Sequence, residues 1–175
     1  MSTTTITNGG VTAVLSSHGA ELVSLKKGGD EYLWQADPRW WTGQAPILFP
    51  MVGSLRGEQA TSAQGPVALR RHGLARDYEH EVVNATASSV TFQLVDSAQT
   101  REGYPYAFKL NMTYALSDEG VLSQTFRVEN TGDVDLPFSV GGHPAFNIPA
   151  PGTKGEFFSD YELVFAQPWS CVAPK

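Results

Sequence analysis

Residues 107–116 read AFKLNMTYAL, and this stretch decides the fold because its side chains alternate between apolar and polar. The apolar positions that share one face are Phe108, Leu110, Met112, Tyr114 and Leu116. A period of two is typical of a β-strand with one buried face. The turn sequence SDEG at residues 117–120 follows directly, and the alternation resumes from residue 122 to residue 130. Two alternating runs joined by a short turn predict a β-hairpin.

Shorter runs of the same kind recur along the chain, each bounded by Gly, Pro, Asn, Asp or Ser. They occupy residues 11–16, 21–26, 82–83, 90–95, 136–140 and 161–165. No stretch carries the pattern of three helical turns with caps. Many short strands predict an all-β fold, an antiparallel sandwich or barrel rather than alternating βαβ units. The Gly- and Pro-rich residues 149–155 are expected to form a loop, so we expect one domain over residues 1–175.

The composition argues against several classes of protein. A chain of 175 residues with 41% hydrophobic content can bury a core, and its net charge of -6 disfavours nucleic acid and anionic membranes as partners. No apolar run approaches the roughly 20 residues that a membrane-spanning helix needs. The single Cys171 cannot form an internal disulfide, and the N-terminus has no signal-peptide pattern. We therefore expect a soluble, cytoplasmic protein.

An aromatic and proline-rich stretch at residues 40–53 is the first candidate for a binding site. Pro46 and Pro50 bracket an apolar run that alternates poorly, which fits either a short buried strand or the floor of a pocket. For Trp40 and Trp41 the favoured interpretation is core packing, since large aromatic side chains are mostly buried. The alternative is that a tryptophan ring stacks on the apolar C–H face of a sugar.

Residues 70–77, RRHGLARD, place three arginines and His72 within seven positions. In an acidic chain this predicts a local positive pocket. Arginine forks suit bidentate recognition of vicinal hydroxyls, carboxylates or phosphate. The plain alternative is a solvated basic turn, in which Asp77 would pair with Arg76.

Residues 138–147, FSVGGHPAFN, contain the second histidine of interest, His143. We expect Gly141 and Gly142 before it and Pro144 after it to give an unusual backbone at the end of a strand, where a side chain is aimed rather than packed. Histidine exchanges protons near neutral pH, so a positioned His143 can serve as an acid–base group. A hydrogen-bonded core histidine is the alternative.

In this order and spacing, the motifs resemble those of the aldose 1-epimerase (galactose mutarotase-like) family, in the branch of the LacX proteins and hexose-6-phosphate epimerases. The resemblance spans nearly the whole chain. It rests on residues 18–22 (HGAEL), 32–34 (YLW), 48–53 (LFPMVG), 71–76 (RHGLAR), 104–106 (YPY) and 141–146 (GGHPAF). Each motif alone is weak, but together they are specific.

The resemblance implies a large antiparallel β-supersandwich with a sugar cleft, incomplete here at its C-terminal end. It also implies a reaction in which a carboxylate base and a histidine acid open the sugar ring, so that the anomeric carbon can close with the opposite configuration. His143 matches the acid, and His72 matches a histidine that hydrogen-bonds the sugar near the ring oxygen. The implied substrate contacts are Arg71, Arg76, Trp41 and Phe146. No metal or organic cofactor is implied.

The glutamate base of the family lies in a part that this sequence does not include. Within the chain Glu21, Glu102 and Asp77 are carboxylates to consider, but no spacing places any of them opposite His143. We therefore expect little activity from these 175 residues alone. A sandwich cut at this point exposes strand edges and apolar surface. Three explanations are open: the chain is a fragment, it is the partner of a second chain that carries the rest, or it completes its sheets by self-association.

Two other functions compete with an isomerase. A non-catalytic carbohydrate-binding domain would use the same aromatic and arginine side chains. A metal enzyme of the cupin type would need closely spaced ligands, whereas His18, His72, His80 and His143 are scattered. The sequence leaves open whether the sugar is a hexose or a hexose phosphate.

Overall fold

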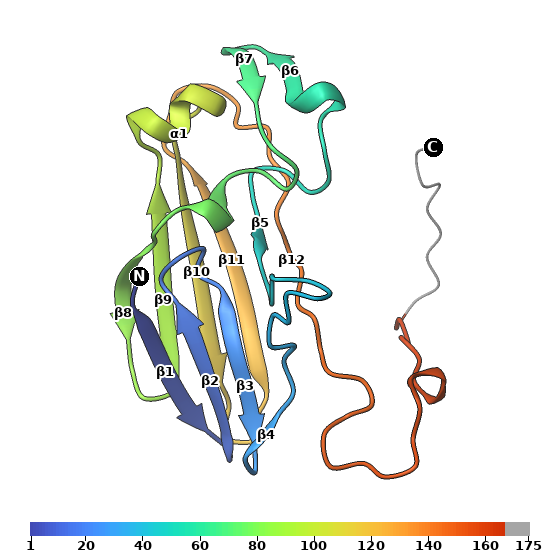
Figure 1. Ribbon diagram of the computed structural model, residues 1–175. Coiled ribbons are helices and arrows are strands. Elements are labelled where there is room, and N and C mark those ends of the chain that lie inside the picture. Colours follow the sequence, from blue (N-terminus) through green and yellow to red (C-terminus); the bar gives the residue numbers. More distant parts are fainter. Residues whose placement is uncertain (167–175) are drawn as a thin grey trace.

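The computed structural model describes residues 1–166, which form two four-stranded antiparallel sheets facing each other (Figure 1). The first sheet consists, in order, of β1 (Thr3–Asn8), β2 (Val11–Ser16), β3 (Leu22–Lys27) and β4 (Asp30–Glu31). The second has the order β11 (Leu122–Asn130), β10 (Phe108–Leu116), β9 (Ser89–Val95) and β8 (Glu81–Ala85). The expected all-β class is confirmed, and so is the hairpin, in which Phe108 pairs with Asn130 and Leu116 with Leu122.

Shorter elements lie at one side and one end of the two sheets. They are β5 (Ile47–Leu48), paired with β12 (Gly141–Gly142), the hairpin of β6 (Gln59–Ser62) and β7 (Gly65–Ala68), the helix α1 (Ala98–Gly103), and the 3-10 turns η1 (Arg56–Glu58), η2 (Ala75–Asp77) and η3 (Phe158–Asp160). Ser97 and Thr100 cap α1 reciprocally, which explains why so short a helix forms. No helix in residues 1–166 is long and apolar enough to cross a bilayer.

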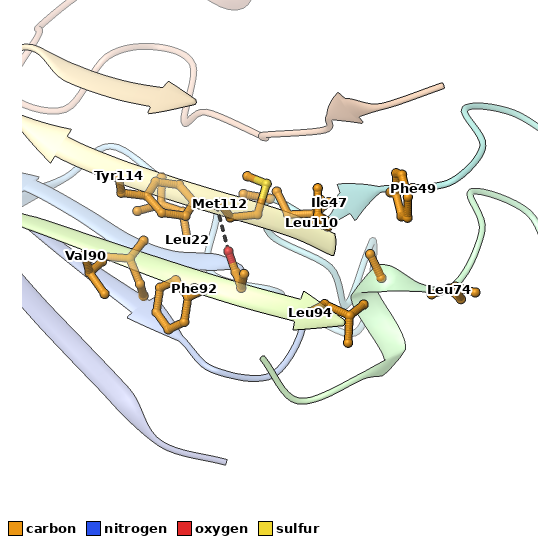
Figure 2. Packing of buried hydrophobic residues seen from close by; sticks show 14 of the residues in the cluster. Leu22, Ile47, Phe49, Leu74, Val90, Phe92, Leu94, Leu110, Met112 and Tyr114 are labelled. Atoms are coloured by element: carbon orange, nitrogen blue, oxygen red, sulfur yellow. Dashed lines mark hydrogen bonds between the residues drawn. The ribbon is translucent and has the colours of Figure 1, made fainter. Parts of the chain in front are cut away.

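The hydrophobic core lies between the two sheets, and β10 supplies its centre. Its apolar positions are buried in strict alternation, as the sequence predicts. Met112 pairs with Phe92 of β9 on the same buried face, and Figure 2 shows both with Leu110 and Ile47 of β5. Burial of each such side chain contributes about 1.5–3 kcal/mol to folding. Because Ile47 belongs to this cluster, the core also fixes the position of β5.

Two expected strands are wrong. Residues 136–140 approach the segment after β5 but form no strand; Pro137 has no N–H, and Ser139 donates one main-chain bond to Pro50 at 2.9 Å. Residues 161–165 form no strand, and Leu163 and Val164 are 89% and 80% exposed. Their apolar character therefore does not reflect burial between these two sheets. Cys171 lies outside the described residues.

Candidate functional site

The segments that carry His72 and His143 both bond to one intervening segment, residues 46–53, which we call the strap. On one side β5 pairs with β12. Beyond that pair, the His143 amide donates to the Pro46 carbonyl at 3.1 Å, and the Ala145 amide donates to the Gln44 carbonyl at 2.9 Å. The backbone at His143 therefore continues the pairing of β12 with β5, and β5 is held in the core through Ile47.

On the other side, Phe49 holds the RHGLAR turn. Its carbonyl accepts hydrogen bonds from the amides of Leu74 at 2.8 Å and Ala75 at 3.1 Å. Gly73 passes so close that a Cβ there would lie 2.3 Å from the Phe49 carbonyl oxygen, and its φ is +77°. Both observations require glycine at this position. The preceding residue, His72, is bonded to the strap through its amide, which donates to the Gly53 carbonyl at 2.7 Å.

The strap brings His72 and His143 together, although 70 other residues separate them in the sequence. Their ring centres are 5.9 Å apart, and the Trp41 ring centre is 5.3 Å from that of His143. The two rings of each pair are tilted, by 57° and 52° respectively. His72 and Trp41 are half-buried and His143 is exposed. Three of the residues that the sequence singles out thus form one accessible cluster.

The backbone before His143 differs from the expectation. Gly141 and Gly142 form β12, and neither has the positive φ that would mark an unusual conformation. The structure gives another reason for Gly142: a Cβ there would lie 3.1 Å from the Gln124 side-chain oxygen and 3.6 Å from the Phe126 ring. The glycine therefore permits close packing of β12 against β11.

His72 itself adopts the unusual backbone, with a φ of +71°. This left-handed conformation is uncommon for a residue with a Cβ and directs the side chain back to the strap. Its Nδ1 lies 3.1 Å from the Gly53 amide nitrogen, and its Nε2 lies 3.2 Å from Nε of Arg71. Burial, followed by the charges of Arg71, Arg76 and His143, lowers the pKa of His72 below its ordinary value. The ring is therefore neutral at pH 7.

The arginines of the turn have different surroundings. Arg71 is exposed beside His72, whereas Arg76 is half-buried and donates from Nη2 to the Arg71 carbonyl at 2.9 Å. The Nε atom of Arg76 is buried without a hydrogen-bond partner among the described residues. Asp77 lies 3.7 Å from Arg70, so its ion pair is with Arg70 and not with Arg76. Arg76 thus supports the turn, and Arg71 is the arginine nearest the cluster.

The aromatic candidates separate into different places. Trp40 is 79% exposed, so core packing is the wrong interpretation for it. The main chain of Trp41 is held in place by Trp34, whose indole N–H donates to the Trp41 carbonyl at 2.8 Å. Phe146 lines a separate hollow with Tyr32 and Leu25. Its proposed contact with a sugar stays a prediction.

Sequence reasoning missed Ser139. Its hydroxyl accepts a hydrogen bond from the Val52 amide at 2.8 Å, and its own amide donates to Pro50. No local pattern marks it, since the bonded residues are more than 80 positions apart and the run 136–140 was expected to be an ordinary strand.

The carboxylates considered as bases have other surroundings. Glu21 accepts two main-chain hydrogen bonds, from Gln44 at 3.0 Å and from Ala45 at 2.7 Å, so it fixes the entry to the strap. Asp77 faces Arg70, and Glu102 lines a hollow beside α1 together with His18. None of the three contacts His143 through a hydrogen bond or ion pair within residues 1–166.

The remaining histidines also have local partners. His18 lies 3.5 Å from Glu79, and the Nε2 of buried His80 lies 2.9 Å from the Ala75 carbonyl oxygen. In the described part of the chain no group of three or more His, Cys, Asp or Glu side chains is arranged to hold a metal ion.

Comparison with known proteins relates this geometry to a family. The sequence model described as aldose 1-epimerase matches residues 2–170. The plasmid-encoded LacX protein of Lactococcus lactis subsp. lactis is 40% identical over 172 residues, which cover 94% of this chain and 56% of that protein.

Solved structures agree with this relationship. A galactose mutarotase related enzyme from Lactobacillus acidophilus matches with a TM-score of 0.83 at 39% identity, covering 88% of this chain and 52% of its own. A galactose mutarotase-like protein from Lactobacillus casei matches with a TM-score of 0.81 at 36% identity, with the same coverage. The chain thus spans about half the length of these relatives.

Proposed function

Because this chain belongs to the aldose 1-epimerase family, we propose that its histidine cluster is part of a mutarotase site that interconverts the α and β anomers of a hexose or hexose phosphate. The observation that supports this most directly is the convergence of His72, His143 and Trp41 from three distant segments. An acid–base side chain, a neutral hydrogen-bonding ring and an aromatic face are three of the groups that ring opening of a sugar uses, and a base is the fourth.

The proposed reaction assigns a role to each member of the cluster. His143 donates a proton to the ring oxygen while a carboxylate removes the proton of the anomeric hydroxyl. The bond from C1 to the ring oxygen breaks, and C1 becomes an open-chain carbonyl. Rotation about the C1–C2 bond and reversal of the proton transfers close the ring with the opposite configuration. His72 orients the sugar near the ring oxygen, and Trp41 supports its apolar face.

The base is the group that residues 1–166 do not place in the cluster. Glu21 is bonded to two amides, Asp77 faces Arg70, and Glu102 is a residue of α1. We therefore propose that the carboxylate comes from outside these residues and that the 175-residue chain alone has little or no mutarotase activity. Removal of one acid–base partner typically costs a factor of about 100 to 10,000 in rate.

Polarimetry on freshly dissolved α-glucose tests the activity. The expected result is a decay of optical rotation close to the uncatalysed rate, and rapid catalysis by the purified chain would contradict the missing base. If catalysis is seen, His143→Gln should abolish it while His18→Gln, a change at a histidine outside the cluster, should not.

A non-catalytic carbohydrate-binding domain is the second candidate, and the exposed Trp40 beside half-buried Trp41 favours it.

Isothermal titration with glucose and with glucose 6-phosphate distinguishes a hexose from a hexose phosphate as the ligand. Tighter binding of the phosphate sugar, lost in Arg71→Gln, would support recognition of phosphate by Arg71. Equal or absent binding of the phosphate sugar would argue against it.

A further inference from the structure

Two hydrogen-bond donors point at the imidazole ring of His72, one at each nitrogen. The Gly53 amide N–H is directed at Nδ1, and the Nε–H of Arg71 is directed at Nε2. A neutral imidazole carries a proton on one nitrogen and accepts through the other, so it can satisfy only one of these donors. The ring is neutral at pH 7, and protonation would leave neither nitrogen able to accept. One of the two contacts must therefore give way.

The Gly53 amide is the donor whose position is fixed by the main chain. The His72 amide donates to the carbonyl of the same Gly53 at 2.7 Å, so the two residues are joined by a pair of bonds. The neighbouring Val52 amide is held by Ser139. If Nδ1 carried the proton, two N–H groups would face each other and both would lose their acceptor, at a cost comparable to a lost hydrogen bond.

Arg71 can move away easily. Its side chain is exposed, has several rotatable bonds and carries four further N–H groups that water can satisfy. The 3.2 Å contact between its Nε and the His72 Nε2 therefore joins two donors once the Gly53 bond has fixed the ring. An acceptor oxygen placed beside Nε2 would relieve that contact and receive the proton of His72.

We infer that the Gly53 amide holds His72 as the Nε2–H tautomer, so that His72 is a permanent hydrogen-bond donor to a ligand oxygen and Arg71 must turn away from the ring edge when the ligand binds. In this arrangement His72 cannot act as a base through Nε2, which already bears its proton. Gly53 is a positioning residue that acts through its main chain. The contact with a sugar oxygen rests on the proposed function, whereas the tautomer does not.

Nuclear magnetic resonance measures the tautomer without any ligand. Long-range ¹H–¹⁵N correlation of the imidazole nitrogens in the full 175-residue chain, at about pH 7.5, should show Nδ1 of His72 as an unprotonated acceptor and Nε2 as protonated. His80 is an internal reference, because its Nε2 faces a carbonyl oxygen and must carry a proton. A protonated Nδ1 at His72, or an averaged pattern of two tautomers, would overturn the inference.

Two kinds of variant sharpen the measurement. Arg71→Met should leave the His72 pattern unchanged, and a switch of tautomer in this variant would show that Arg71 sets it. His72→Asn keeps an acceptor near the position of Nδ1 and tolerates the positive φ, but offers no donor near Nε2. Glucose affinity in His72→Asn should fall about tenfold, the size expected for one hydrogen bond, and unchanged affinity would contradict the donor role.

The two hypotheses fail in different ways. If the wild-type chain binds neither glucose nor glucose 6-phosphate, the proposed function fails while the assigned tautomer stands on the resonance data. If Nδ1 carries the proton, the inference fails whether or not sugar binds.

Discussion

The hydroxyl of Ser139 accepts a hydrogen bond from the amide of Val52 at 2.8 Å, and this bond joins the segment leading to His143 to the strap that holds His72. The Ser139 amide completes the link by donating to the Pro50 carbonyl at 2.9 Å. Because residues 136–140 form no strand with the strap, these two bonds set the spacing of the histidine segments at this level. The relative position of the two rings thus depends on Ser139, which forms no hydrogen bond with either ring.

Ser139→Ala removes the side-chain bond and should lower the free energy of unfolding by about 1 kcal/mol, the usual net value of one hydrogen bond. Sugar affinity should fall as well, because the two histidines lose a shared anchor. Urea unfolding and isothermal titration measure the two effects. Ser123→Ala, at an exposed position of β11, is the matched control and should change neither. Unaltered affinity in Ser139→Ala would show that the strap is held by its main chain alone.

Gly73→Ala should be among the most destabilising single changes in the RHGLAR turn. The new Cβ would lie 2.3 Å from the Phe49 carbonyl oxygen, in a backbone whose φ is +77°. The left-handed conformation alone costs roughly 1–2 kcal/mol. The clash adds about 1–3 kcal/mol, the range for overpacking.

Gly57→Ala is the control for Gly73→Ala. Gly57 has a similar φ of +62°, but nothing lies within 4 Å of its Cβ position. It should show only the conformational cost, so the difference between the two variants in urea unfolding isolates the contact with Phe49. Equal losses in both variants would mean that the turn moves away from the strap without penalty.

Local periodicity in the sequence predicted most of the sandwich. The hairpin of β10 and β11 follows from alternation that one buried face enforces. The same reasoning failed at residues 161–165, because an apolar run shows only that a partner surface exists and does not say which one. It also missed β1, where four threonines among six residues conceal the single buried Ile6.

The sequence predicted that His72 and His143 lie close together, but it did not predict the bonds that hold them. His72 and His143 stand out through glycine, proline and arginine neighbours, and the structure brings them to 5.9 Å. The positive φ belongs to His72, not to the glycines before His143, because the tight approach of Gly73 to Phe49 decides the backbone there. Such a contact across 24 residues leaves no local signal in the sequence.

Acidification should destabilise the protein through His80. Burial lowers the pKa of His80, whose Nε2 lies against the Ala75 carbonyl and whose Nδ1 has no hydrogen-bond partner among the described residues. Its folded-state pKa is below the unfolded value of about 6.5, so the unfolded chain binds the proton first. Stability is therefore full above about pH 6.5 and decreases as the pH falls below it.

The contribution of His80 can be separated from that of His72, whose pKa is also lowered, with burial as the main cause. Urea unfolding at several values between about pH 7.5 and about pH 5.5 should show a shallower loss of stability in His80→Gln than in the wild type. His72→Gln removes the other histidine whose pKa is lowered, so the acid sensitivity that remains in this variant is that of His80. Identical slopes in wild type and His80→Gln would exclude His80 as a source of the acid sensitivity.

Glu21→Gln tests whether the acidic position in the HGAEL motif is structural or catalytic. The Glu21 carboxylate accepts hydrogen bonds from the amides of Gln44 and Ala45, at the entry to the strap. The neutral amide can still accept through its oxygen but loses the charge, so we expect a loss of about 1–2 kcal/mol in the free energy of unfolding. Sugar affinity, measured where the variant is fully folded, should change little.

Glu102→Gln is the matched control for Glu21→Gln, because this carboxylate belongs to α1 and lines a hollow away from the strap. It should preserve stability. Mutarotase activity can be measured where a longer chain or an added polypeptide supplies it. At saturating sugar, and at equal concentrations of folded protein, Glu21→Gln should keep the wild-type rate. The reason is that Glu21 is bonded to main-chain amides and is not aimed at His143. A fall in that rate of the size expected for a lost general base, about 100-fold or more, with stability unchanged, would make Glu21 the catalytic carboxylate after all.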